Sequence, residues 1–264
     1  MLNLIAGEFA KLKRKKIVPF IILLSLLFPL IVVYTSKMGM GNDTSLEFLK
    51  GRFDLSYTMM LGYGLVFLEP CLLGILASIL FFMERDNDTF KNLCVIPVTT
   101  SRLIAAKLFV VLIYGLFYTL CNTVFMIFFT WVLKAGIIYD VGFKLVFSLV
   151  FGIGITIATL PVIVFIIYFN KSYLLLSFFY AILNWSVLSL VEVNLSLVKV
   201  INLFPTLCVM NWSSKKMMGR LADRYLSEAA YLLFPSDIWA FAVLGITLVF
   251  SILLMLHFYK KWTR

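Results

Sequence analysis

Six stretches of this chain are long, apolar and almost free of charged side chains, and they constrain the fold more than any other feature. A helix that crosses roughly 30 Å of hydrocarbon at about 1.5 Å per residue needs about 20 apolar residues. The six predicted membrane spans are 17–35, 59–83, 108–133, 144–169, 173–191 and 237–258. The sequence therefore predicts an all-α integral membrane protein, in which residues 1–264 form a single transmembrane domain.

The composition excludes a soluble enzyme. Hydrophobic residues make up 62% of the chain, charged residues 14%, and the mean hydropathy is +1.03, whereas soluble domains are about 45–50% apolar and about a quarter charged. The net charge of +10 is typical of nucleic-acid binders. Most of the 26 Phe, however, lie in uncharged runs rather than beside Lys and Arg, so no nucleic-acid partner is expected. Four cysteines without paired spacing and a single histidine, His257, predict no metal site.

The distribution of Lys and Arg predicts the orientation. With the N-terminus inside, the cytoplasmic segments hold 13 basic residues and the outer segments, 36–58, 134–144 and 192–236, hold 10. Because cytoplasmic loops carry the excess of Lys and Arg, both termini are predicted to lie in the cytoplasm. The Pro235-Ser236-Asp237 sequence is a helix start and is expected to open the last span.

The loop 84–107 predicts a short helix outside the membrane. Asp88 is a natural N-cap, residues 89–96 make about two turns, and Pro97 ends them. Three apolar side chains share one face of this helix: Phe90, Leu93 and Cys94. Such a helix either docks a soluble partner or lies flat in the interface and contacts only lipid.

The segment 192–236 is too apolar for a solvated loop. It predicts one or two short interfacial helices between spans five and six, with the alternative that it forms an outer lid over an exit route. Its basic cluster would lie near anionic headgroups: Lys215, Lys216, Arg220 and Arg224.

Glu69, followed by Pro70, is the charged residue that the sequence places inside the membrane. An intramembrane carboxylate is costly and is a candidate functional group, although a protonated Glu that bonds a neighbouring helix is an equally physical explanation. Span five carries a polar stripe, which either lines a cavity or joins helices by hydrogen bonds. The stripe and its neighbour are Tyr173, Ser177, Tyr180, Asn184 and Trp185.

The whole chain resembles the permease subunits of type-two ABC transporters. The resemblance rests on the order of residues after span two and on the amphipathic start LNLIAGEFAKLKRKK, where Glu8 and Lys11 lie one turn apart. The order after span two is Glu84, Thr89, Leu93, Pro97, Ser101-Arg102 and Lys107. The resemblance implies a connecting helix at the start, and a cytoplasmic coupling helix that contacts the ATPase through Glu84, Asp88, Thr89, Phe90, Leu93 and Pro97. It also implies a substrate path between spans two and five, with Glu69, Tyr180, Asn184 and Trp185 as candidates.

No Gly-Lys pair occurs in these 264 residues, so the chain lacks the phosphate-binding loop of an ATPase. We therefore expect a non-catalytic subunit that binds no cofactor and takes its energy from a partner chain or an ion gradient. The resemblance implies that ATP and Mg²⁺ are bound by two copies of a separate ABC ATPase. A second permease copy, or a related permease, completes the expected assembly.

The opening GEFAKLKRKK is similar to the lantibiotic-immunity permeases of Gram-positive bacteria. This narrower resemblance implies a bacterial plasma-membrane exporter that removes a hydrophobic or amphipathic compound, such as a peptide antibiotic, and so confers resistance. The alternative is a gradient-driven carrier, or a membrane sensor or scaffold, without an ATPase.

Overall fold

The computed structural model describes residues 1–13, 15–39, 44–86, 99–169, 177, 179–180, 182–183, 186, 198–221 and 234–262. Within these residues all regular structure is helical, which confirms the predicted all-α class for this part of the chain. The elements are α1 (Leu2–Lys13), α2 (Ile17–Gly39), α3 (Leu46–Met59), the π-helix η1 (Met60–Leu68), α4 (Glu69–Asp86), α6 (Thr100–Val132), α7 (Val141–Ala158), α8 (Leu160–Phe169), α10 (Val198–Ile201), α11 (Pro205–Leu221) and α13 (Asp237–Trp262).

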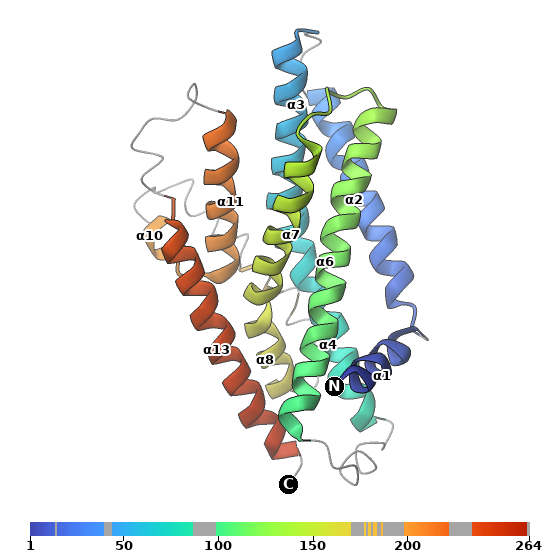
Figure 1. Cartoon of the computed structure of the whole chain (residues 1–264), viewed down its shortest axis with the longest axis vertical. Helices are drawn as coiled ribbons and strands as arrows, with labels where there is room; N and C mark the ends of the chain where they lie inside the picture. Colours follow the sequence, from blue (N-terminus) through green and yellow to red (C-terminus); the bar gives the residue numbers. More distant parts are fainter. Residues whose placement is uncertain are drawn as a thin grey trace.

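Five helical stretches in the described residues are long and apolar enough to cross a membrane: 17–39, 46–83, 100–132, 141–169 and 237–259. Each overlaps one predicted span. The remaining predicted span, 173–191, falls largely outside the described residues, so the count of six stays a prediction. Both termini lie at the same end of the bundle (Figure 1). We call this the terminal end, and the opposite end the far end.

The prediction of an outer loop at 36–58 is wrong for most of its length. Helix α2 continues to Gly39, and α3 begins at Leu46. The Ser45 hydroxyl caps α3 by accepting the Phe48 N–H at 3.4 Å. Phe53 and Tyr57, one turn apart, are both buried, so this stretch has the period of a packed helix. Helix α3 continues without a break into η1 and α4, and its tip extends beyond the neighbouring helices at the far end (Figure 1).

A proline divides the span 141–169 into two helices. Pro161 has no N–H, so the helix cannot make its normal bond to the carbonyl four residues earlier. Helix α7 ends at Ala158, and Thr159 separates it from α8. The Thr159 hydroxyl donates to the Thr156 carbonyl at 2.7 Å, which satisfies part of the interrupted backbone.

Helix α11 differs from the short interfacial helices predicted for the segment 192–236. It has 17 residues and packs against α7 and α13. The other described helix of this segment, α10, has four residues. Its contact face is buried and includes Leu207, Cys208 and Val209. Trp212 of α11 stacks on Phe147 of α7 with ring centroids 5.8 Å apart. The first half of the segment therefore contributes to the bundle itself.

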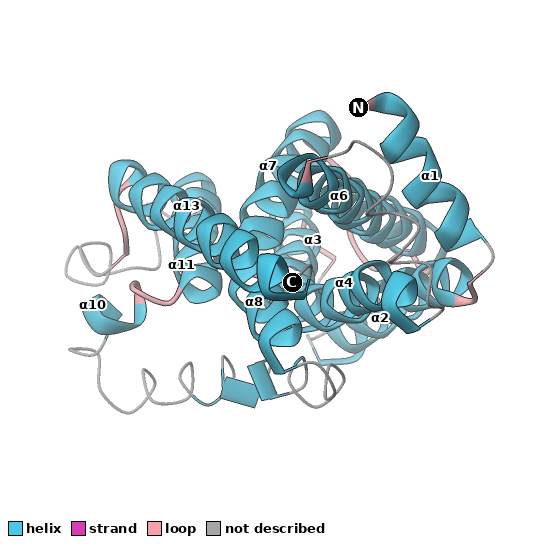
Figure 2. Cartoon of the chain, turned by 90° about the horizontal axis from the view of Figure 1, so that it is seen from below, coloured by secondary structure: helices cyan, strands magenta, loops and turns pink. Residues whose placement is uncertain are grey.

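The predicted start of the last span is confirmed. The Ser236 hydroxyl accepts the Trp239 N–H at 3.2 Å and caps α13. Helix α6 begins at Thr100. Helix α1 lies across the terminal end at an angle to the bundle (Figure 2) and buries Glu8 and Leu12.

Among the described cysteines, Cys71 and Cys208 are buried and Cys121 is half-buried, and all three are free of disulfides. Burial raises the pKa of the Cys208 thiol to about 11. A thiol with a pKa this high is a poor nucleophile, so Cys208 acts in packing.

Candidate functional site

Glu69 lies at the junction between the π-helix η1 and α4, and its side chain is fully buried. Its backbone N–H donates to the Leu65 carbonyl, which is the regular α-helical spacing resumed after the wider π turns. Pro70 follows and removes one backbone donor at this point. Segments of π-helix in an otherwise α-helical span are frequent at functional sites.

The Glu69 carboxyl group joins three helices. Thr119 Oγ1 of α6 lies 3.4 Å from Glu69 Oε2, and Thr156 Oγ1 of α7 lies 3.4 Å from Oε1. Gly115 makes this approach possible, because a Cβ there would lie 3.1 Å from Oε1 and only 2.4 Å from Thr156 Oγ1. Among the described residues, no basic side chain forms an ion pair with Glu69.

The donors around Glu69 fit a protonated carboxyl group. The Thr119 hydroxyl has one proton, and it lies 2.8 Å from the Gly115 carbonyl, a normal hydrogen-bond distance. If the Thr119 hydroxyl donates its hydrogen bond to the Gly115 carbonyl, its oxygen can accept a hydrogen bond from a protonated Glu69. A neutral carboxyl therefore satisfies every group in the cluster, whereas a carboxylate would be buried with weak donors at 3.4 Å.

Buried hydroxyl groups continue from Glu69 toward the far end. Thr123, one turn after Thr119, donates to the Thr119 carbonyl and lies 2.8 Å from Ser148 Oγ. Ser148 Oγ in turn lies 2.8 Å from the Tyr57 hydroxyl, which also donates to the Lys144 carbonyl at 2.8 Å. This buried row connects α3, α6 and α7 through polar contacts inside an otherwise apolar core.

A second buried cluster closes the far end, and the sequence analysis missed it. Lys144 Nζ pairs with Asp54 Oδ1 at 2.8 Å, and both side chains are about 3% exposed or less. The Tyr139 hydroxyl donates to Asp54 Oδ2. Three rings surround the ammonium group, at 4.2 to 5.6 Å from their centroids: Phe53, Tyr57 and Tyr139. We call this group the far-end cap.

The basic residues of the far end also anchor the end of α6. Lys37 Nζ donates to the Leu133 carbonyl at 2.7 Å, and Arg52 to the Ala135 carbonyl at 3.4 Å. Cations at a helix C-terminus are favourable because the last carbonyls are unsatisfied and carry partial negative charge. The sequence analysis had assigned Lys37, Arg52 and Lys144 to outer loops. The helical period of Phe53, Tyr57 and Met60 was the signal that could have found the cap.

The terminal end holds a third buried pair. Glu8 of α1 pairs with Lys11 at 2.6 Å, as the one-turn spacing predicts. Its other oxygen lies 3.2 Å from Nζ of Lys107 in α6, and Lys107 also donates to the Leu80 carbonyl of α4. Lys107 is fully buried, with the Phe81 ring 5.6 Å away. The contacts of Glu8 and Lys107 therefore tie α1 to α4 and α6, the helices that flank residues 87–98.

The predicted ATPase contacts fall outside the described part of the chain. Glu84 lies in α4, but its side chain is not described. The other predicted contacts lie outside the described residues: Asp88, Thr89, Phe90, Leu93 and Pro97.

The polar stripe of span five is partly described. Tyr180 donates to the Ala158 carbonyl at 2.9 Å, so Tyr180 and Glu69 bond to the same turn of α7. Ser177 packs on Gly74 of α4, where a Cβ would lie 2.2 Å from its hydroxyl. These two contacts favour the helix-joining interpretation. Tyr173, Asn184 and Trp185 lie outside the described residues.

A comparison with known families identifies one match. A family model described as "ABC-2 family transporter protein" matches residues 4–184, which is more than half of the chain. The matched range includes Glu69, the far-end cap and the buried pair at the terminal end. In the comparisons with curated proteins and with solved structures, nothing matches the chain.

Proposed function

We propose a cargo and a direction of transport, starting from one premise: the chain belongs to the ABC-2 family of transporter proteins. It is a multi-pass membrane protein and the membrane permease subunit of an ABC transporter, and it works with an ABC ATPase partner. In our proposal two ATPase subunits bind a dimer of this chain, or of this chain and a related permease, in a bacterial plasma membrane. Both termini lie in the cytoplasm. The complex exports a hydrophobic or amphipathic compound.

The observation that carries the proposal is the buried Glu69 cluster. It is a polar point of contact between three long helices inside the family match, at a break from α to π geometry. A permease that alternates between two arrangements needs helices that can shift against each other, and neutral hydroxyl and carboxyl groups can exchange partners at low cost. We infer that α4, α6 and α7 move relative to one another here during transport.

The proposed cargo is a lantibiotic or a similar membrane-active peptide antibiotic, removed for immunity or resistance. The support for it is the basic opening at residues 7–16, with its similarity to lantibiotic-immunity permeases. Helix α1, which carries most of this opening, is tied to α4 and α6 by Glu8 and Lys107. We place the ATPase contact on residues 84–97, between the ends of these two helices.

The first test is purification of the tagged chain from its native membranes in a mild detergent. We expect a soluble protein with a phosphate-binding GxxxxGK[ST] loop to co-purify in stoichiometric amount. The double variant Phe90→Asp/Leu93→Asp should lose this partner, while Lys134→Asp at the far end should keep it. Normal co-purification of the double variant would contradict the coupling helix. Purification of the chain alone would favour a gradient-driven carrier.

The cargo needs a separate test. Sensitive cells that express the chain and its ATPase should tolerate a severalfold higher concentration of a lantibiotic. The same cells with the phosphate-loop lysine of the ATPase replaced should not. Equal protection against unrelated cationic peptides, or protection that persists without ATPase activity, would exclude a dedicated lantibiotic exporter.

A further inference from the structure

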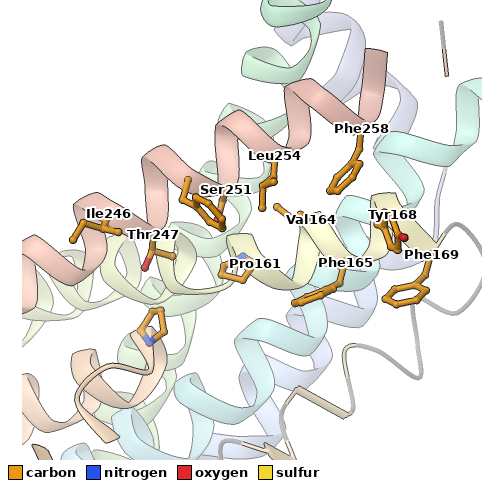
Figure 3. A pocket seen from close by; sticks show the side chains of 12 residues that line it. Pro161, Val164, Phe165, Tyr168, Phe169, Ile246, Thr247, Ser251, Leu254 and Phe258 are labelled. Carbon is orange, nitrogen blue, oxygen red and sulfur yellow. The ribbon is translucent and has the colours of Figure 1, made fainter. Parts of the chain in front are cut away.

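An apolar groove runs between α8 and α13 on the side of the bundle, with a volume of about 470 Å³. This volume lies in the range of specific ligand sites, which is roughly 300–1,000 Å³. Figure 3 shows the two facing rows of side chains, with Phe165 and Tyr168 on α8 opposite Ser251 and Leu254 on α13. Pro161 and Pro205 line the groove nearer its far end. The groove is therefore long, narrow and formed by two membrane-spanning segments.

The walls of the groove are half-exposed, while its floor is buried. Phe165, Tyr168 and Phe250 are each more than 50% exposed, but Val164 and Ser251 are about 5% exposed or less. At the terminal end the Tyr168 and Phe258 rings meet with centroids 4.9 Å apart. Flat aromatic walls with an aliphatic floor suit a flexible alkyl chain, which gains contact with carbon on three sides.

The position of the groove determines which molecules can reach it. Its two walls belong to spans that are apolar enough to lie in a bilayer, so its open side faces hydrocarbon rather than water. Its polar groups contribute little, because the Thr247 hydroxyl already donates to the Val243 carbonyl at 2.7 Å. A lipid acyl chain meets both conditions.

The basic sequence at the terminal end of α13 favours an anionic lipid. Helix α13 continues past the groove as Tyr259-Lys260-Lys261-Trp262, and its sequence holds no acidic residue after Asp237. Helix α8 carries no charged residue at all. Adjacent lysines in the sequence at the end of a membrane span attract anionic headgroups. We propose that the groove between α8 and α13 binds one acyl chain of an anionic phospholipid, whose headgroup lies at the terminal end of α13.

The test uses the purified full chain, with any partner that accompanies it, in phosphatidylcholine bilayers that contain a trace of photoactivatable lipid. Phosphatidylglycerol and phosphatidylcholine probes, each with a diazirine on the acyl chain, are compared, and labelled peptides are mapped by mass spectrometry. We expect the anionic probe to label residues 161–169 and 246–258 severalfold more than the zwitterionic probe does.

Three variants make the test specific. Thr247→Trp fills the groove and should lower labelling severalfold, whereas Val249→Trp, on the exposed face of the same helix, should not change it. Lys260→Gln/Lys261→Gln should remove the preference for the anionic probe and keep basal labelling. This double variant leaves the groove intact, so the proposal stays testable if Thr247→Trp does not fold.

Three results would overturn the proposal. Equal labelling of Thr247→Trp and Val249→Trp would mean that bulk lipid reacts with the surface of α13. Equal labelling by the two probes in the unaltered chain would mean that the groove does not prefer a lipid with an anionic headgroup. A Phe250→Cys variant, at an exposed wall of the groove, that cross-links two copies of the chain would show that a second copy, and not a lipid, covers the groove.

Discussion

At the scale of single residues, the buried charged and polar groups explain how this apolar bundle acquires one arrangement. Apolar side chains pack about equally well against lipid and against each other, so they specify helix partners weakly. A buried Glu69 between two threonines, or a Lys144 paired with Asp54, is satisfied only where neighbouring helices supply polar partners. Each such residue therefore determines which helices meet.

The first prediction concerns the protonation state of Glu69. Glu69→Gln should retain transport and thermal stability, because the amide keeps the shape of a neutral carboxyl and can donate to Thr119. Glu69→Ala should lose about 2–4 kcal/mol of stability, since it leaves a cavity and removes the hydrogen-bond partner of the buried Thr156 hydroxyl. Melting curves of the purified variants, with export assays in cells, measure both effects. Loss of export in a fully stable Glu69→Gln variant would mean that transport requires ionisation of this group.

The second prediction concerns the far-end cap. Lys144→Met leaves Asp54 buried without its cation and should cost about 3–5 kcal/mol. The double variant Asp54→Asn/Lys144→Met should recover most of this loss, because it removes both charges, keeps an acceptor for Tyr139 and leaves a thioether among the rings. Lys50→Met serves as the control, with a cost of about 1 kcal/mol or less, because Lys50 only lies near the Tyr139 ring. A double variant no more stable than Lys144→Met would argue against the pair.

At the scale of elements, α1 is part of the bundle rather than a loose surface helix. Its amphipathic character predicts a helix on the membrane surface, and the structure adds a buried ion pair from Glu8 to Lys107. Because Lys107 also bonds the Leu80 carbonyl, one ammonium group connects α1, α4 and α6. Movement of any one of these helices is transmitted to the other two.

The third prediction tests this connection. Glu8→Ala should destabilise the chain by about 3–5 kcal/mol, because the buried Lys107 loses its ion pair with the Glu8 carboxylate. The exchange Glu8→Lys/Lys107→Glu should restore part of the loss, since it re-forms the pair with opposite polarity. Lys13→Ala, in the exposed last turn of α1, should change stability by less than about 0.5 kcal/mol. Thermal unfolding in detergent distinguishes the four proteins, and a neutral Glu8→Ala would show that α1 is held by apolar contacts alone.

At the scale of the whole molecule, the apolar runs predicted the membrane-spanning helices. They did not predict the buried polar contacts, which join residues far apart in the sequence. Five of the predicted spans coincide with span-length helices, because about 20 apolar residues can satisfy their backbone in lipid only as a helix. The pair of Asp54 and Lys144 is separated by 90 residues, and no local period announces such a contact. As predicted loop charges, Lys37 and Arg52 gave no sign that they bind the chain at the end of α6, and Lys144 gave none of its pair with Asp54. Glu69 was found because a lone charge in a long apolar run is visible in the sequence.

The fourth prediction concerns orientation. In a variant without native cysteines, Lys134→Cys at the far end should react with a membrane-impermeant maleimide in intact cells. Lys13→Cys at the terminal end should react only after the membrane is opened, since both termini are proposed to be cytoplasmic. The reverse pattern would invert the proposed direction of transport, and labelling of both sites in intact cells would indicate a mixed topology.

The uninterrupted helix from Leu46 to Asp86 gives the molecule a lever. At about 1.5 Å per residue it is roughly 60 Å long, about twice the thickness of the hydrocarbon layer. The π turns of η1 lie near the middle of this rod. A tilt of about 10° about that middle would carry the Asp86 end and the tip of α3 through roughly 5 Å each, in opposite directions. A movement at one membrane surface would therefore reappear, reversed and undiminished, at the other.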